Sequence, residues 1–208
     1  MINLINVFIF SLKQPYWYNP IIHSLGNTGF SGNVHAISTP FFTKLIDIKA
    51  YSGVNIRKKI YSDTDADGII CDLCCGTGFS TKPGHVGVDT SKEMLRYAGF
   101  FNPGSRYAFG NAETYGNDNQ FDIVTCMFAF HEIPEEGHVN IIKNAIRLAK
   151  KNIIIVDIST DYIPSDLMLS GEPYILDYLE NIDKLFNRFS FRKETIIKGH
   201  VDKWTYKK

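Results

Sequence analysis

Short apolar runs bounded by glycine or polar residues alternate with stretches of helical spacing along most of this chain. Runs of four to eight apolar residues between turn signals are typical of buried strands. The predicted strands cover residues 69–73, 86–88, 108–109, 121–130 and 153–158. Helical spacing predicts helices at residues 41–51, 54–60, 91–100 and 134–152, and one that begins at Pro173. This alternation is typical of an α/β fold with a mostly parallel sheet.

The turn after the first buried strand carries the candidate chemistry. Gly76 and Gly78 let the backbone turn tightly at the carboxyl end of this strand, where a side chain would block an approaching ligand. Asp89 ends the next apolar run, and its carboxylate can accept hydrogen bonds from both hydroxyls of a ribose. Together these residues predict a nucleoside site at the edge of an open α/β sheet.

Two common phosphate-binding motifs do not fit this turn. A dinucleotide site has G-x-G-x-x-G, and Thr81 occupies the place of the third glycine. A phosphate loop has a Lys-Ser/Thr pair after its last glycine, and that pair is absent. The turn is therefore neither a dinucleotide-binding turn nor a phosphate loop.

Residues 72–78, Asp-Leu-Cys-Cys-Gly-Thr-Gly, resemble motif I of the class I S-adenosylmethionine-dependent methyltransferases. The cysteines before Gly-Thr-Gly are most similar to the branch that contains the ubiquinone and menaquinone C-methyltransferases. The resemblance continues in family order through residues 87–95, 110–113 and 121–124, and covers roughly residues 66–160. It implies a Rossmann-like fold whose mostly parallel sheet ends in an antiparallel hairpin. That hairpin is expected around residues 195–197 and 201–206.

The resemblance also implies S-adenosylmethionine as the cofactor. Asp72 would hold the methionine ammonium, directly or through a water, and the turn's glycines would offer N–H groups to the carboxylate. Asn111 would bind adenine where the family has an acid, or it is a plain turn residue. Met127 and Phe128 would lie against the adenosine or methionine portion. The candidate cofactor-binding residues are Asp72, Leu73, Cys74, Gly76, Thr77, Gly78, Asp89, Thr90, Met94, Asn111, Ala112, Glu113, Met127 and Phe128.

His131 and Glu132 follow the predicted strand 121–130 and are the candidate catalytic residues. A residue after the carboxyl end of such a strand faces the ligand crevice, and imidazole titrates near neutrality. A base is needed only if the methyl acceptor carries a proton, because methyl transfer depends chiefly on positioning. Otherwise these two residues cap the following helix.

The connection between Gly78 and Asp89 is shorter than the family's usual multi-turn helix. Pro83 and Gly84 would break a helix there, so at most one turn fits. This shortening, together with Cys74 and Asn111 in place of the family's usual residues, leaves a non-catalytic binding subunit as an alternative.

The N-terminal segment, residues 1–62, is expected to pack on the core as a lid, and residues 63–208 to form the methyltransferase domain within one structural unit. Residues 15–32, rich in proline, aromatic residues and glycine, are loop-like. Trp17, Tyr18 and His23 line the substrate side or simply pack on the sheet. The apolar residues 2–12 lack the features of a targeting segment and are read as a buried element.

No metal site is expected. Residues 63–68 match the first half of a calcium loop, but its twelfth position is Cys74 rather than glutamate. Cys71, Cys74 and Cys75 lack both the spacing and the fourth ligand of a zinc site.

Composition limits the partners. The chain of 208 residues has 22 basic and 22 acidic side chains, so no overall field favours nucleic acid. No apolar run approaches the roughly 18–20 residues of a membrane span. Clustered cysteines favour a reducing compartment, the cytoplasm, without excluding an organelle. The sequence therefore predicts methylation of a small molecule at O, N or C. A protein or nucleic-acid target is the alternative, and the oligomeric state is not predicted.

Overall fold

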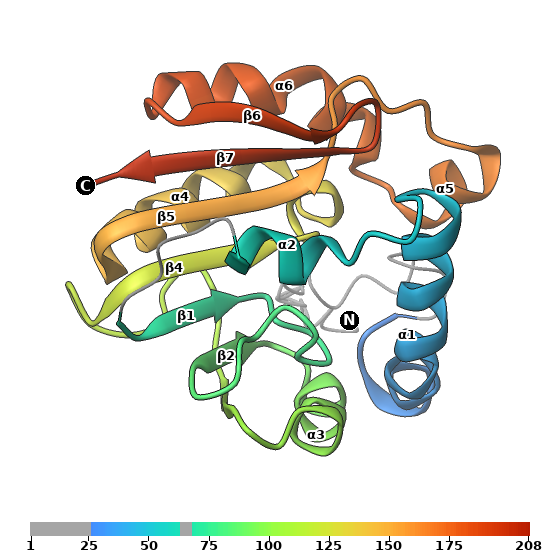
Figure 1. Ribbon diagram of the computed structural model, residues 1–208, viewed down its shortest axis with the longest axis horizontal. Coiled ribbons are helices and arrows are strands. Elements are labelled where there is room, and N and C mark those ends of the chain that lie inside the picture. Colours follow the sequence, from blue (N-terminus) through green and yellow to red (C-terminus); the bar gives the residue numbers. More distant parts are fainter. Residues whose placement is uncertain (1–25, 63–67) are drawn as a thin grey trace, which may run out of the picture.

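The computed structural model describes residues 26–62 and 68–208. Seven strands form one sheet in the order β3-β2-β1-β4-β5-β7-β6 (Figure 1). Neighbouring strands from β3 to β5 are parallel, whereas β7 runs antiparallel to β5 and β6. The strands are β1 Ile70–Leu73, β2 Val86–Asp89, β3 Arg106–Phe109, β4 Phe121–Met127, β5 Ala149–Ile158, β6 Arg192–Ile197 and β7 Val201–Lys207. The expected Rossmann-like sheet with its C-terminal antiparallel hairpin is confirmed.

The order of the strands creates a switch point beside β1. The chain proceeds from β1 outward through β2 to β3, then returns to place β4 on the other side of β1. Connections therefore leave the ends of β1 and β4 in opposite directions, and the carboxyl ends of these strands flank a crevice.

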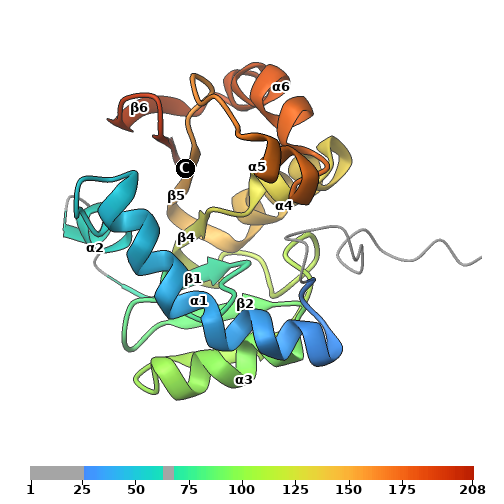
Figure 2. The same cartoon turned by 90° about the vertical axis from the view of Figure 1, so that its right-hand side faces the viewer.

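Seven helical segments surround the sheet within the described residues. They are α1 Gly29–Lys49, α2 Ile56–Ser62, α3 Lys92–Phe101, the 3-10 turn η2 Phe130–Glu132, α4 Glu135–Leu148, α5 Asp166–Gly171 and α6 Ile175–Arg188. α3 begins where the Ser91 hydroxyl accepts the N–H of Met94, a standard N-terminal cap. Helix α1 runs past the carboxyl ends of the central strands and packs against α3 (Figures 1 and 2). No described helix has the length and apolar character to cross a membrane.

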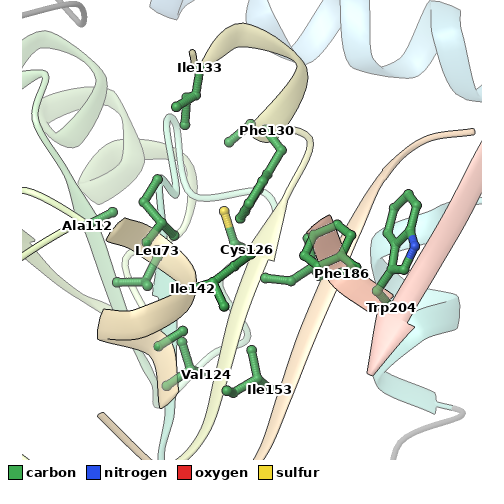
Figure 3. Packing of buried hydrophobic residues seen from close by; sticks show 14 of the residues in the cluster. Leu73, Ala112, Val124, Cys126, Phe130, Ile133, Ile142, Ile153, Phe186 and Trp204 are labelled. Carbon is green, nitrogen blue, oxygen red and sulfur yellow. The ribbon is translucent and has the colours of Figure 1, made fainter. Parts of the chain in front are cut away.

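The main core lies between the sheet and helices α4 and α6. Leu73, Val124 and Ile153 of three adjacent strands face Ile142 of α4 there (Figure 3). The rings of Phe186 in α6 and Trp204 in β7 pack with centroids 4.9 Å apart. Each such side chain contributes roughly 1.5–3 kcal/mol when fully buried. A second cluster on the other face packs α2 against the same strands, so side chains cover both faces of the central strands.

The structure corrects the boundary between α4 and β5. The apolar spacing predicted a helix to residue 152 with Lys150 and Lys151 in its last turn, but the helix ends at Leu148. Ala149 is already extended and pairs with Phe121 of β4. Sheet pairing therefore overrides the helical propensity of the two lysines.

A helix begins within one segment expected to be irregular, and a further helix, α5, starts where the Ser165 hydroxyl accepts the N–H of Met168. Helix α1 starts at Gly29, within the stretch expected to be loop-like. Trp17, Tyr18 and His23, and residues 63–67 of the calcium-like loop, lie outside the described residues.

Candidate active site

A cavity of about 670 Å³ lies at the carboxyl ends of the central strands. Its walls come from the turn after β1, the end of β2, the segment after β3, the end of β4 with η2, and helix α1. The predicted cofactor-binding residues that line it are Cys74, Gly76, Thr77, Asp89, Thr90, Met94, Asn111, Ala112, Met127 and Phe128. The predicted catalytic residues His131 and Glu132 line it as well. The fold thus brings most of the predicted site together.

Asp89 joins the turn after β1 to the end of β2. One carboxylate oxygen accepts the N–H of Gly76 and the other accepts the N–H of Ser91, each at 2.8 Å. Burial raises the pKa of Asp89, and these backbone N–H donors oppose that rise. An ionised carboxylate has about four acceptor positions. Asp89 therefore keeps acceptor capacity for a ligand in the cavity.

The turn after β1 has an unusual backbone. Cys74, Gly76 and Gly78 all have positive φ, at 56°, 51° and 80°. A Cβ on Gly78 would overlap the phenol end of Tyr107, whose Cζ would lie 2.9 Å away. Gly78 is therefore a packing residue below the cavity rather than part of its wall. Cys74 adopts the left-handed conformation that few residues other than glycine adopt, and such strain tends to occur at functional sites.

Asp72 is fully buried and does not line the cavity. Hydroxyls of Ser80 and Thr81 donate to one of its oxygens and the Thr125 hydroxyl donates to the other, all at 2.8 Å. Burial raises the pKa of Asp72 to about 6, and these hydroxyls oppose that rise. The side chain thus differs from its expected place beside the methionine ammonium. It anchors the short connection, which contains no helix, to β1 and β4.

Of the predicted residues after β3, some line the cavity and others pack against the rest of the protein. Asn111 lines the cavity, and its side-chain oxygen accepts the N–H of Glu113 at 2.8 Å. Its NH₂ group has no partner within the described part of the chain. Glu113 instead accepts the side-chain N–H of Asn140 at 2.7 Å. Leu73 belongs to the main core. Glu113 and Leu73 are therefore the other two predicted residues that lie outside the cavity wall.

His131 is paired with a residue that sequence reasoning missed. Its Nδ1 lies 2.6 Å from Oδ1 of Asp157 at the end of β5, and its Nε2 lies 3.7 Å from Oε1 of Glu132. Burial lowers the pKa of His131, but the Asp157 carboxylate more than reverses this and brings it to about 9. His131 is therefore a cation at neutral pH rather than the neutral base expected from an ordinary imidazole. The sequence signal that could have identified Asp157 is an acid near the end of the apolar run 153–158, at the carboxyl end of a predicted strand.

Arg57 of α2 is a second missed residue of the cavity wall. Its guanidinium carbon lies 4.7 Å from the ring centroid of Phe128. Burial lowers the pKa of Arg57, and the nearby Tyr51, Asp47 and Asp72 oppose this. It forms no ion pair with a described carboxylate. An incompletely paired cation beside a cavity is suited to binding an anionic ligand group.

Comparison with known proteins identifies the domain. Residues 70–152 match the family model described as "Methyltransferase domain". No curated protein sequence matches the chain at a significant level.

Solved structures share the fold at low sequence identity. A methyltransferase from Aquifex aeolicus, described as dependent on S-adenosylmethionine, has a TM-score of 0.57 at 17% identity, covering 81% of this chain and 97% of that one. The DhpI complex with S-adenosylhomocysteine (SAH) has a TM-score of 0.59 at 12% identity, covering 84% and 93%. The magnesium protoporphyrin IX methyltransferase of Synechocystis PCC 6803 has a TM-score of 0.51 at 17% identity, covering 74% and 80%.

The sheet order, the glycine turn facing Asp89 and the matched domain agree with one another. Residues 70–152 therefore carry a methyltransferase domain, on a fold shared with S-adenosylmethionine-dependent methyltransferases.

Proposed function

We propose that this protein methylates a small molecule, with S-adenosylmethionine held across the carboxyl ends of β1, β2 and β4. The observation that carries the proposal is the Asp89 carboxylate, bonded to the N–H of Gly76 at the switch point of the sheet and facing the cavity. Ligands of open α/β sheets bind at this position. The cavity, about 670 Å³, is within the usual range for small-molecule sites.

The nucleoside end of the cofactor would lie between β2 and the segment after β3. Asp89 would accept the two ribose hydroxyls, and the free NH₂ of Asn111 would donate to an adenine ring nitrogen. Met94 and Ala112, which also line the cavity, would supply apolar contacts. Because the Asn111 oxygen is used by Glu113, we assign Asn111 the role of a donor to adenine.

The methionine end would lie toward Arg57 and Phe128. Methyltransferases with a helix after the glycine turn have its N-terminus available for a carboxylate. No helix follows this turn, so Arg57 would supply the positive charge instead. The Phe128 ring would complete this end of the site.

The bound cofactor supplies an electrophilic methyl group. The acceptor would enter beside His131 and Glu132, which line the cavity after β4. His131, held as a cation by Asp157, can donate Nε2–H to an acceptor oxygen or orient Glu132. The Glu132 carboxylate is then the group that takes the proton of an O–H or N–H acceptor.

A small acceptor is favoured over a nucleic acid because the 22 basic and 22 acidic residues give no net charge. The Synechocystis neighbour is named as a methyltransferase of magnesium protoporphyrin IX, a small molecule, which supports the same class here. All four cysteines are free, which supports a reducing compartment such as the cytoplasm.

Calorimetric titration with S-adenosylmethionine and with SAH tests the cofactor site directly. Methyl incorporation from labelled S-adenosylmethionine into small-molecule extracts, compared with protein and RNA fractions, then tests the acceptor class. Binding together with incorporation into the small-molecule fraction is expected. Absence of binding would refute the proposal, and incorporation only into protein or RNA would refute the acceptor class.

A further inference from the structure

Helix α1 has two exposed or half-exposed faces that differ in their surroundings. One face lines the cavity through His35, Thr39, Phe42, Thr43 and Ile46, followed by Ala50 after the helix. The other points away from it and carries Phe30, Val34, Ile37, Phe41, Leu45 and Ile48. Of the neighbouring residues Phe41 and Phe42, the first therefore faces outward and the second faces the cavity. The cavity residues Phe42 and Ile46 thus each have an apolar outer neighbour, Phe41 and Leu45.

The cavity face changes character along the helix. Its N-terminal part is polar and lies at the nucleoside end, because His35 contacts the carbonyl of Gly26 and the carbonyl of the next residue, Asn27, accepts the Ser91 hydroxyl. Its C-terminal part is apolar and leads to Tyr51, whose ring stacks on Phe128 at the end of β4. The apolar part therefore borders the methionine end of the proposed site, and the acceptor side lies next to that end because the methyl group is attached there.

Apolar side chains that follow in the chain line the same cavity. They are Ile158 at the end of β5, Tyr162 in the loop after it, and Met168 in α5. Phe42 is 50% exposed and Ile46 is 48% exposed although both line the cavity. Half-exposed apolar side chains at a cavity rim mark an opening rather than a closed wall. The apolar strip of α1 in the cavity wall thus reaches the surface, as an apolar passage from the acceptor side would.

We propose that the methyl acceptor is amphipathic, with its polar reacting end beside Glu132 and an apolar chain lying between α1 and the α5 segment. This inference rests on the proposed function and names the acceptor class. Glu132 and Glu172 lie close to His131, whereas Phe42, Ile46 and Met168 supply apolar parts of the cavity wall. A fully polar acceptor would leave these apolar side chains in contact with water and gain nothing from them.

The test uses the full chain saturated with SAH, titrated with 4-ethyl-, 4-butyl-, 4-hexyl- and 4-octylphenol. Each methylene that enters the passage should tighten binding by up to about fourfold, until the chain reaches solvent. Binding affinity should rise from butylphenol to octylphenol, and Phe42→Ser and Ile46→Asn should each reduce this rise in affinity by at least about tenfold. The matched outer variants Phe41→Ser and Leu45→Asn should leave that gain unchanged.

A second variant covers the case in which Phe42→Ser or Ile46→Asn fails to fold. Ile46→Trp fills the passage instead of opening it and should shorten the chain length at which the gain stops. Affinity independent of chain length overturns the inference, as does an equal loss in the outer variants. A separate titration with SAH distinguishes failure of the proposed function from failure of the amphipathic-acceptor proposal. No SAH binding refutes the proposed function, whereas SAH binding without chain dependence refutes only the amphipathic acceptor.

Discussion

The imidazole of His131 lies 2.6 Å from the carboxylate of Asp157, a residue 26 positions later in the chain. The second oxygen of Asp157 accepts the backbone N–H of Phe130 at 2.7 Å. One carboxylate therefore fixes both the charge of the imidazole and the turn that carries it. This pairing joins the ends of β4 and β5 and places a cation, rather than a neutral base, at the cavity.

We predict that His131 makes stability depend on pH above neutrality. Its pKa in the folded protein, about 9, exceeds the ordinary value of 6.5. The protonated form is therefore favoured by folding, and this stabilisation is complete below about pH 6.5 and is lost as the pH rises through about 9. The loss should be on the order of 3 kcal/mol, measured by urea unfolding at pH 6 and pH 9.

The control for this prediction is His131→Asn, which removes the titrating group and keeps a polar side chain. Other groups that titrate over the same range remain in both proteins, so the difference isolates His131. If wild type and variant lose equal stability over this range, the imidazole is not held as a cation by Asp157.

Asp89→Asn should weaken binding of SAH by about 10- to 100-fold, because a hydrogen bond to a charged group contributes roughly 1.5–3 kcal/mol. Isothermal titration calorimetry measures this directly. Glu180→Gln, on the exposed side of α6, is the control and should bind like wild type. Unchanged affinity in Asp89→Asn would contradict the ribose assignment.

Arg57→Gln should weaken S-adenosylmethionine by about tenfold, since one charge-assisted contact to the methionine carboxylate is lost. It should leave 5′-deoxy-5′-methylthioadenosine, which lacks that carboxylate, unaffected. Arg188 lies 5.7 Å from the Phe189 ring and is exposed, so Arg188→Gln is a matched control. Equal losses for both ligands would show that Arg57 acts on the fold and not on the carboxylate.

Gly78→Ala should destabilise the protein by about 2–4 kcal/mol, combining left-handed strain with overlap onto Tyr107. Gly84→Ala is the matched comparison, because Gly84 also has positive φ, at 85°, but a Cβ there meets nothing within 4 Å. It should cost only about 1–2 kcal/mol. Urea unfolding measures both, and equal costs would rule out the contact with Tyr107.

Local patterns predicted most of the fold. The apolar runs at β1, β2 and β4 are short and bounded by turn residues, so their type could be assigned from neighbours in the sequence. The start of α3 was equally local, because Ser91 caps its own helix. The end of α4 was not local: Ala149 becomes extended because Phe121, far away in sequence, pairs with it.

The sequence by itself determined that a glycine turn and an acid follow consecutive strands. It predicts a nucleoside site there, because parallel strands bring their carboxyl ends to one edge. The tertiary structure decided the charge and orientation of the side chains there. Asp72 turned to three hydroxyls and His131 to Asp157 because buried polar groups must find partners in space. Those partners come from strands whose pairing no local pattern encodes.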